Sequence, residues 1–179
     1  IAFAKAGAAV IVNDLGTDYE GGGVSSDPAF DVVDEIITAG GRAVASTHDI
    51  STSEGARAIL CTALDAFGDV TGLINNAGIL RNKSLFDMTA ADMHAVLGVH
   101  LMGTFNLTKE VATYWRERIE AGRDVNASIV NTSSVAGLFP EAAVIGDKTI
   151  AQLGAYAPAK AAVAAFTIAT SFELKPFGI

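Results

Sequence analysis

The chain has 179 residues, of which 50% are hydrophobic and 18% are charged, and its formal net charge is −8. This composition fits a single globular domain and excludes a disordered tail, a collagen-like fibre and a disulfide scaffold. The acidic balance argues against a nucleic-acid or membrane partner, because either would require a basic face. No apolar stretch approaches the roughly 18 residues that a spanning helix needs. The single cysteine, Cys61, excludes an internal disulfide and fits a reducing, cytoplasmic compartment.

The predicted elements alternate between helices and strands. An apolar helical run over 1–7 leads into a β-branched strand at 8–13, and a polar loop follows. Asp27 and Pro28 are typical of a helix start and predict a helix over about 29–39. The same signals predict strands at 42–46, 71–75 and 127–132, with a long loop after the last of these. They also predict helices from Ser51 or Ser53 to Phe67, from Thr89 to about Ala121 with any break at Gly98, and from Tyr156 to Lys175.

Strands that alternate with helices predict a parallel sheet with helical crossovers, and therefore one α/β domain over residues 1–179. The strands are apolar along most of their length, which is typical of a sheet covered on both faces. The chain begins with Ile1, and residues 175–179 stop where another strand would begin, so we expect it to be the interior of a longer domain. Because this architecture hosts many activities, the function has to be inferred from the site residues.

The main catalytic signal is Tyr156 followed by Lys160, because positions i and i+4 share one face of a helix. A free phenol has a pKa of about 10, which is too high for acid–base work near neutrality. A neighbouring cation favours the phenolate, so the pair predicts a group that adds or removes a hydroxyl proton. The alternative is an ordinary helix with a tyrosine and an exposed lysine, a pattern that is common by chance.

Two short segments follow predicted strands, where residues of a parallel sheet face the binding crevice. Ser134 follows the fourth strand and offers a hydroxyl to a substrate carbonyl and its developing oxyanion. The alternative is that this hydroxyl only satisfies turn amides. Asn75, Asn76, Ala77 and Gly78 follow the third strand. Small residues there let a flat ligand approach and Asn can bridge strands, although a plain turn has the same composition.

Acidic residues follow the first two strands. Asp14 is placed to accept both ribose hydroxyls of NAD, and its charge would repel the 2′-phosphate of NADP. No basic residue stands beside it in 13–16, so the sequence favours NAD. Asp49 and Ile50, after the second strand, are weaker candidates for an adenine contact. The alternative for Asp14 is an aspartate that simply starts a loop.

Other chemistries have less support in the sequence. His48, His94 and His100 are scattered, without carboxylates or cysteines at ligand spacing, so we expect no metal site. Serine hydrolysis is disfavoured because neither Ser133 nor Ser134 lies in a G-x-S-x-G turn.

Together and in this order, these motifs resemble the short-chain dehydrogenase/reductase family over nearly the whole chain. The resemblance implies a Rossmann-type, doubly wound parallel sheet and reversible hydride transfer between NAD(P) and a secondary alcohol or ketone. It implies that Tyr156 is the acid–base group, that Lys160 binds the cofactor ribose and activates Tyr156, and that Ser134 orients the substrate oxygen. The expected cofactor-binding residues are Asp14, Asp49, Ile50, Asn76, Ala77, Gly78, Tyr156 and Lys160.

A closer likeness is to the hydroxyacyl-CoA dehydrogenase part of peroxisomal multifunctional enzymes and their bacterial relatives. It rests on the runs 12–16, 78–81 and 99–105, and it suggests a 3-hydroxyacyl thioester substrate. His100 stands where many members of the family carry an asparagine, and these closer relatives also tend to have histidine there. We therefore expect His100 not to inactivate the protein, and its structural role stays open.

The spacing between two candidate residues departs from the family pattern. Ser134 and Tyr156 are 22 positions apart, more than the family usually shows. The extra residues are expected within 140–153, where they would either extend a substrate-facing loop or displace Ser134.

The resemblance also implies which family elements this chain lacks. These are the glycine-rich loop and first strand, which would lie between the first and third strands seen here, and the C-terminal strands. The helices over about 90–121 and 156–175 resemble the family's oligomer-forming pair, so we expect a homodimer or homotetramer. One alternative function is a non-catalytic dinucleotide-binding sensor or scaffold on the same fold. Another is an epimerase or dehydratase, although the motif at 75–78 favours the simple dehydrogenases.

Overall fold

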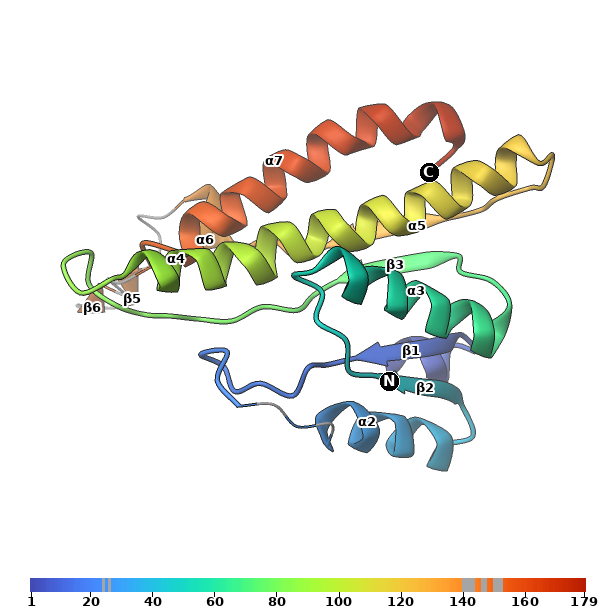
Figure 1. The fold of residues 1–179 in the computed structure, drawn as a ribbon, viewed down its shortest axis with the longest axis horizontal. Helices are drawn as coiled ribbons and strands as arrows, with labels where there is room; N and C mark the ends of the chain where they lie inside the picture. Colours follow the sequence, from blue (N-terminus) through green and yellow to red (C-terminus); the bar gives the residue numbers. More distant parts are fainter. Residues whose placement is uncertain (24, 26, 140–143, 146–147, 150–152) are drawn as a thin grey trace.

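The computed structural model describes residues 1–23, 25, 27–139, 144–145, 148–149 and 153–179 (Figure 1). Its helices are α1 (Ala2–Lys5), α2 (Asp27–Thr38), α3 (Ser53–Phe67), α4 (Ala90–Leu97), α5 (Gly103–Glu120), α6 (Val135–Leu138) and α7 (Tyr156–Leu174). Its strands are β1 (Ala9–Asn13), β2 (Arg42–Ser46), β3 (Gly72–Asn75), β4 (Ser128–Asn131), β5 (Val144–Ile145) and β6 (Lys148–Thr149). A π-helical turn, η1 (Gly98–Met102), joins α4 to α5, and a 3₁₀ turn, η3 (Lys175–Phe177), follows α7.

Two pairs of parallel strands form the sheet. β1 pairs with β2, with Ala9 opposite Arg42, and β3 pairs with β4, with Gly72 opposite Ser128. Among the described residues no ladder joins β1 to β3, so the sheet consists of two halves. The interruption falls where the resemblance places a further strand. The α/β class is therefore confirmed, with the expected incomplete parallel sheet.

The β1–β2 half is packed on both faces, as the sequence predicted. Val10 and Val12 contact a cluster that includes Ile36 of α2, whereas Ile11 points the other way and contacts a cluster that includes Ile59 of α3. This alternation follows from the two-residue period of a strand. The β1–β2 half therefore lies between α2 and α3 (Figure 1).

The described residues cover only one face of the β3–β4 half. On that face lies Trp115 of α5, which is fully buried and donates a hydrogen bond from its indole nitrogen to the Val70 carbonyl at 2.6 Å. On the opposite face, Ile74 is 46% exposed and Val130 is 54% exposed. The expectation of two covered faces is therefore wrong for this half.

Three local predictions need correction. The cap of α3 is Thr52, not Ser51 or Ser53, because the Thr52 hydroxyl accepts a hydrogen bond from the Gly55 amide at 3.0 Å. Gly98 does not break the long helix, since it keeps helical angles and begins the π-turn η1. The short helix α6 forms in the segment expected to be a loop.

None of the helices in the ranges that the structure describes has both the length and the apolar character needed to cross a membrane.

Candidate active site

The candidate site lies at the carboxyl ends of the strands. β1 and β3 both run toward the left of Figure 1, and parallel pairing gives β2 and β4 the same directions. Asp14, Asp49, Asn76 and Ser134 follow these strands closely, so all four are placed on this side of the molecule. In a parallel α/β sheet this is the side on which ligands bind.

Tyr156 and Lys160 are brought together as the sequence predicted. Tyr156 is half-buried in the first turn of α7, and the Lys160 ammonium lies 5.8 Å from the centre of its ring. Lys160 is only 4% exposed, and its ammonium donates a hydrogen bond to the Thr132 carbonyl at 2.6 Å. Burial lowers the pKa of Lys160 below its ordinary value of 10.5. The alternative of an exposed lysine is therefore wrong.

Ser134 is held close to this pair by α6, whose N-cap it forms. Its hydroxyl oxygen accepts a hydrogen bond from the Ala136 amide at 3.2 Å, which leaves its O–H available as a donor. α6 rests directly on α7, because a Cβ at Gly137 would lie 2.5 Å from the Ala161 amide nitrogen. The capping role that we weighed against catalysis is thus present. A contact of Ser134 with substrate stays a prediction, and the expected insertion over 140–153 falls largely outside the described residues.

His100 occupies a position in the site that the sequence left open. It lies in the π-turn η1 and is 2% exposed, and its Nε2 is 2.8 Å from the Ile79 carbonyl oxygen. The imidazole meets the Tyr156 ring edge to face, with ring centres 5.3 Å apart. Gly78 makes room for it, since a Cβ there would lie 2.3 Å from the imidazole. Burial and the Lys160 charge lower the pKa of His100, so the neutral ring is favoured.

The segment after β3 joins the strand ends and stays open to a ligand. The buried Asn75 side chain donates hydrogen bonds to Asn131 at 2.9 Å and to Thr108 at 3.2 Å, so it bridges β3 and β4 as expected. The Asn76 side chain accepts a hydrogen bond from the Thr132 hydroxyl at 3.0 Å. Asn76, Ala77 and Gly78 are exposed, as residues that line a cofactor would need to be before it binds.

Hydrogen bonds between neighbouring residues connect the segments that carry the acidic residues after β1 and β2. The Asn13 side chain accepts a hydrogen bond from Ser46 at 2.7 Å and donates one to the His48 carbonyl at 3.2 Å. Asp14 and Asp49 each follow one member of this group. Asp14 is exposed and accepts a hydrogen bond from the Gly16 amide at 2.7 Å, so it also starts the loop.

Ile50 has a structural role that the sequence did not show. Its side chain lies over Gly103 of α5, where a Cβ would be 2.6 Å away, and its carbonyl accepts a hydrogen bond from the Asn106 side chain at 3.0 Å. These contacts fix the segment after β2 to α5, while an adenine contact stays a prediction. Within the parts of the chain that the structure describes, no three His, Cys, Asp or Glu side chains gather as metal ligands.

Sequence comparison places these features among known proteins. Residues 2–179 match the family model of the short chain dehydrogenases. Peroxisomal multifunctional enzyme A from Dictyostelium discoideum is 46% identical over 137 residues, covering 76% of this chain and 29% of that protein. Hydroxyacyl-CoA dehydrogenase ChsB1 from Mycobacterium tuberculosis is 37% identical over 185 residues, covering 100% of this chain and 53% of that protein. The chain thus spans about half or less of these two relatives.

Solved structures show the same architecture. A short chain dehydrogenase from Mycobacterium avium superposes with a TM-score of 0.84 at 37% identity, covering 99% of this chain and 58% of that one. A 7α-hydroxysteroid dehydrogenase complexed with NADH and 7-oxo glycochenodeoxycholic acid gives a TM-score of 0.78 at 30% identity, covering 100% of this chain and 60% of that one. The expected Rossmann-type fold is therefore confirmed.

Proposed function

Since this chain belongs to the short-chain dehydrogenase family, we propose that it carries the acid–base site of an oxidoreductase that interconverts a secondary alcohol and a ketone with NAD(H). The observation that carries this proposal is the buried Lys160 ammonium, held one helical turn after Tyr156 and 5.8 Å from the centre of its ring. Burying a cation is unfavourable unless it is paired or hydrogen-bonded. The hydrogen bond to the Thr132 carbonyl offsets part of this cost, and the placement of the cation beside a phenol supports a role of Tyr156 in proton transfer.

Three side chains would take part in proton transfer and in binding the substrate oxygen. Tyr156 takes the hydroxyl proton as the alcohol becomes a ketone and returns it in the reverse direction. The positive charge of Lys160 favours the phenolate form that accepts this proton. Ser134 donates its O–H to the substrate oxygen while its own oxygen stays bonded to the Ala136 amide. NAD(H), when bound, supplies the hydride donor or acceptor.

The exposed residues after β1 and β3 fit a dinucleotide. Asp14 offers a carboxylate to ribose hydroxyls and would repel a 2′-phosphate, which favours NAD over NADP. Asn76, Ala77 and Gly78 would line the cofactor. Asp49 and Ile50 are retained as the candidates for an adenine contact.

A 3-hydroxyacyl thioester is the substrate that we propose. One support is the name of a relative, the hydroxyacyl-CoA dehydrogenase ChsB1. The other is apolar surface beside Ser134: Val135 is 65% exposed, and Leu138 and Phe139 are each 57% exposed. Such side chains suit the alkyl part of an acyl substrate, because its contact with them would remove apolar surface from water.

Turnover by the whole protein that contains this chain tests the proposal. We expect NADH to form from NAD with 3-hydroxyacyl-CoA thioesters, faster than with short unactivated secondary alcohols and faster than with NADP. NADH binding without turnover of any alcohol would favour the alternative, a non-catalytic dinucleotide-binding sensor or scaffold. Turnover that requires NADP would contradict the role of Asp14.

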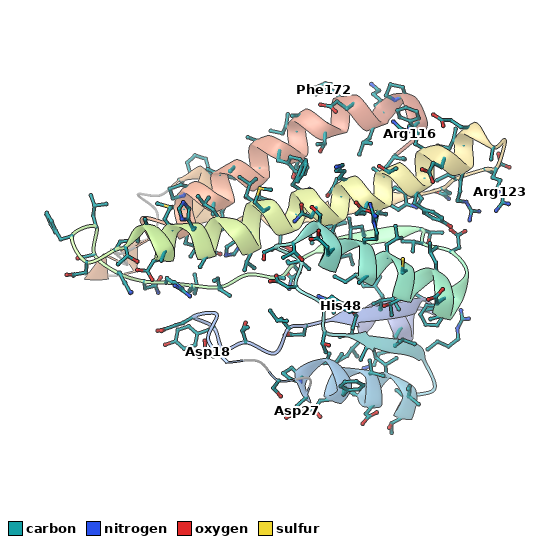
Figure 2. All side chains as sticks on the ribbon, viewed as in Figure 1. Asp18, Asp27, His48, Arg116, Arg123 and Phe172 are labelled. Atoms are coloured by element: carbon teal, nitrogen blue, oxygen red, sulfur yellow. The ribbon has the colours of Figure 1, made fainter. Side chains whose placement is uncertain are left out.

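Assembly and location are also proposals. Met102 of η1 is 43% exposed, Phe105 of α5 is 38% exposed and Phe172 of α7 is 72% exposed, and Figure 2 labels Phe172 on the outer side of α7. This apolar surface supports a homodimer or homotetramer, which light scattering of the purified protein would detect. We propose a cytoplasmic location from the single thiol of Cys61. Because several related enzymes are named peroxisomal, fluorescence imaging of the tagged whole protein should include a peroxisomal marker.

A further inference from the structure

The loop after β1 forms a tight turn around Asp18. Asp18 accepts hydrogen bonds from the Glu20 amide at 2.9 Å and from the Gly22 amide at 2.8 Å, and its own amide donates to the Gly22 carbonyl at 2.8 Å. Figure 2 labels Asp18 in this loop. The turn is exposed, so its shape alone does not explain what holds it in place.

The same turn is docked on the segment that follows β3. The Leu80 amide donates a hydrogen bond to the Tyr19 carbonyl at 2.7 Å. Gly21 packs against Ile79 so closely that a Cβ would lie 2.9 Å from the Ile79 side chain, and its φ of +84° also favours glycine. The loops after β1 and β3 are therefore in direct contact, although their strands are not paired.

Arg81 extends this contact to α4. Its Nε donates to the Glu20 carbonyl at 3.0 Å, and its Nη1 donates to an oxygen of Asp92 at 3.1 Å. Asp92 is 3% exposed at the start of α4 and also accepts hydrogen bonds from Lys83 and Thr89. The hydrogen bonds from these partners lower the pKa of Asp92 well below its ordinary range, so the carboxylate stays charged and holds Arg81.

The two loops joined by Arg81 are the loops that carry the proposed cofactor residues. Asp14 begins the loop after β1, and Asn76 to Gly78 begin the segment after β3. The Leu80 amide and the Arg81 guanidinium connect these two loops directly. A guanidinium suits this task, because its rigid fork can bond two groups at once.

We propose that Arg81 is a positioning residue that clasps the turn 18–22 to the start of α4 and so sets the distance between the two cofactor-binding loops. This inference rests on the proposed function only in its second part, the effect on NAD binding. The clasp itself is a property of the fold and has its own readout. Asp92 acts through Arg81, which it holds by a hydrogen bond.

The experiment compares Arg81→Lys with Lys83→Ala in the whole protein. Lysine at position 81 keeps a cation beside Asp92 but has no fork to bond the Glu20 carbonyl as well. Lys83→Ala removes another partner of the same carboxylate without touching the turn 18–22. Hydrogen exchange of the amides in 18–22 and of Leu80, measured without cofactor, reports the clasp, and the NADH dissociation constant and kcat report its effect.

In Arg81→Lys we expect these amides to exchange about ten- to a hundredfold faster, as loss of a hydrogen bond to a charged group predicts. We also expect weaker NADH binding with kcat unchanged at saturating NADH, whereas Lys83→Ala should behave as wild type in the loop amides. Unchanged exchange in Arg81→Lys would overturn the clasp. Faster exchange with unchanged NADH affinity would overturn its link to the cofactor. A wild-type protein that binds no NADH would overturn that link together with the proposed function, while the exchange result would still decide the clasp.

Discussion

At the scale of single residues, burial determines the protonation state of His100. The imidazole is 2% exposed and faces Tyr156, the Lys160 cation and the Ile79 carbonyl. Burial lowers its pKa below the ordinary value of 6.5, and the Lys160 charge acts in the same direction. Its Nδ1 is buried and has no partner among the described residues, so a second proton would have no acceptor there. The site is therefore built around a neutral ring.

The stability of the protein should depend on pH through His100. An unfolded histidine binds its proton near pH 6.5, about its unperturbed pKa, whereas folded His100 binds it only at lower pH. Between these values the unfolded state holds more protons, so the free energy of unfolding decreases as the pH falls below about 6.5. Urea unfolding across this range should show the decrease in wild type and a smaller one in His100→Gln. The exposed His94→Gln is the control, and equal decreases in wild type and His100→Gln would contradict the prediction.

At the scale of elements, the contact of α6 with α7 places Ser134 relative to Tyr156. Gly137 allows this contact, because a Cβ would lie 2.5 Å from the backbone nitrogen of Ala161 and 2.6 Å from the carbonyl carbon of Lys160. Backbone atoms of a long helix cannot move aside as a flexible side chain can. A larger residue at position 137 must therefore shift α6, and with it the hydroxyl of Ser134.

Gly137→Ala should lower kcat, because a shift of α6 would displace the Ser134 hydroxyl from the substrate oxygen. Overpacking of this kind costs about 1–3 kcal/mol of stability, which urea unfolding measures. Gly72→Ala in β3 is the matched control, since a Cβ there meets nothing within 4 Å. If kcat is unchanged although the stability falls, the position of Ser134 does not matter to the reaction.

At the scale of the whole molecule, two half-sheets meet through their loops and helices. A cluster of Ile59, Leu107, Ile11 and Leu73 joins the halves on the side of α3 and α5. At the carboxyl ends, Arg81 and the backbone contact of Leu80 join the loops after β1 and β3. The proposed cofactor residues thus come from both halves, whereas Tyr156 and Lys160 belong to the β3–β4 half.

Sequence reasoning succeeded where the signal is local. Helical spacing and short β-branched runs predicted the long helices and four main strands, and the start of a helix at Thr89 was predicted correctly. The i, i+4 spacing placed Lys160 beside Tyr156 because a helix fixes that geometry whatever surrounds it.

The remainder depends on contacts between distant segments, which periodicity does not encode. Arg81 and Asp92 are 11 positions apart and look like ordinary surface charges in the sequence, yet Asp92 is buried. The sequence placed any break of the long helix at Gly98, where the structure has a π-turn, and glycine is compatible with either. The close approach at Gly137 shows no pattern in the sequence, since it requires the packed position of α7.

The measurement that tests the central claim most directly is single-site replacement of the Tyr156 hydroxyl in the whole protein. In Tyr156→Phe we expect the dissociation constant for NADH to stay close to that of wild type and kcat to fall by about 10²–10⁴-fold, the usual contribution of a positioned acid–base group. Tyr114→Phe, whose hydroxyl bonds Asp69 instead, should keep full activity. Wild-type turnover by Tyr156→Phe would contradict the account.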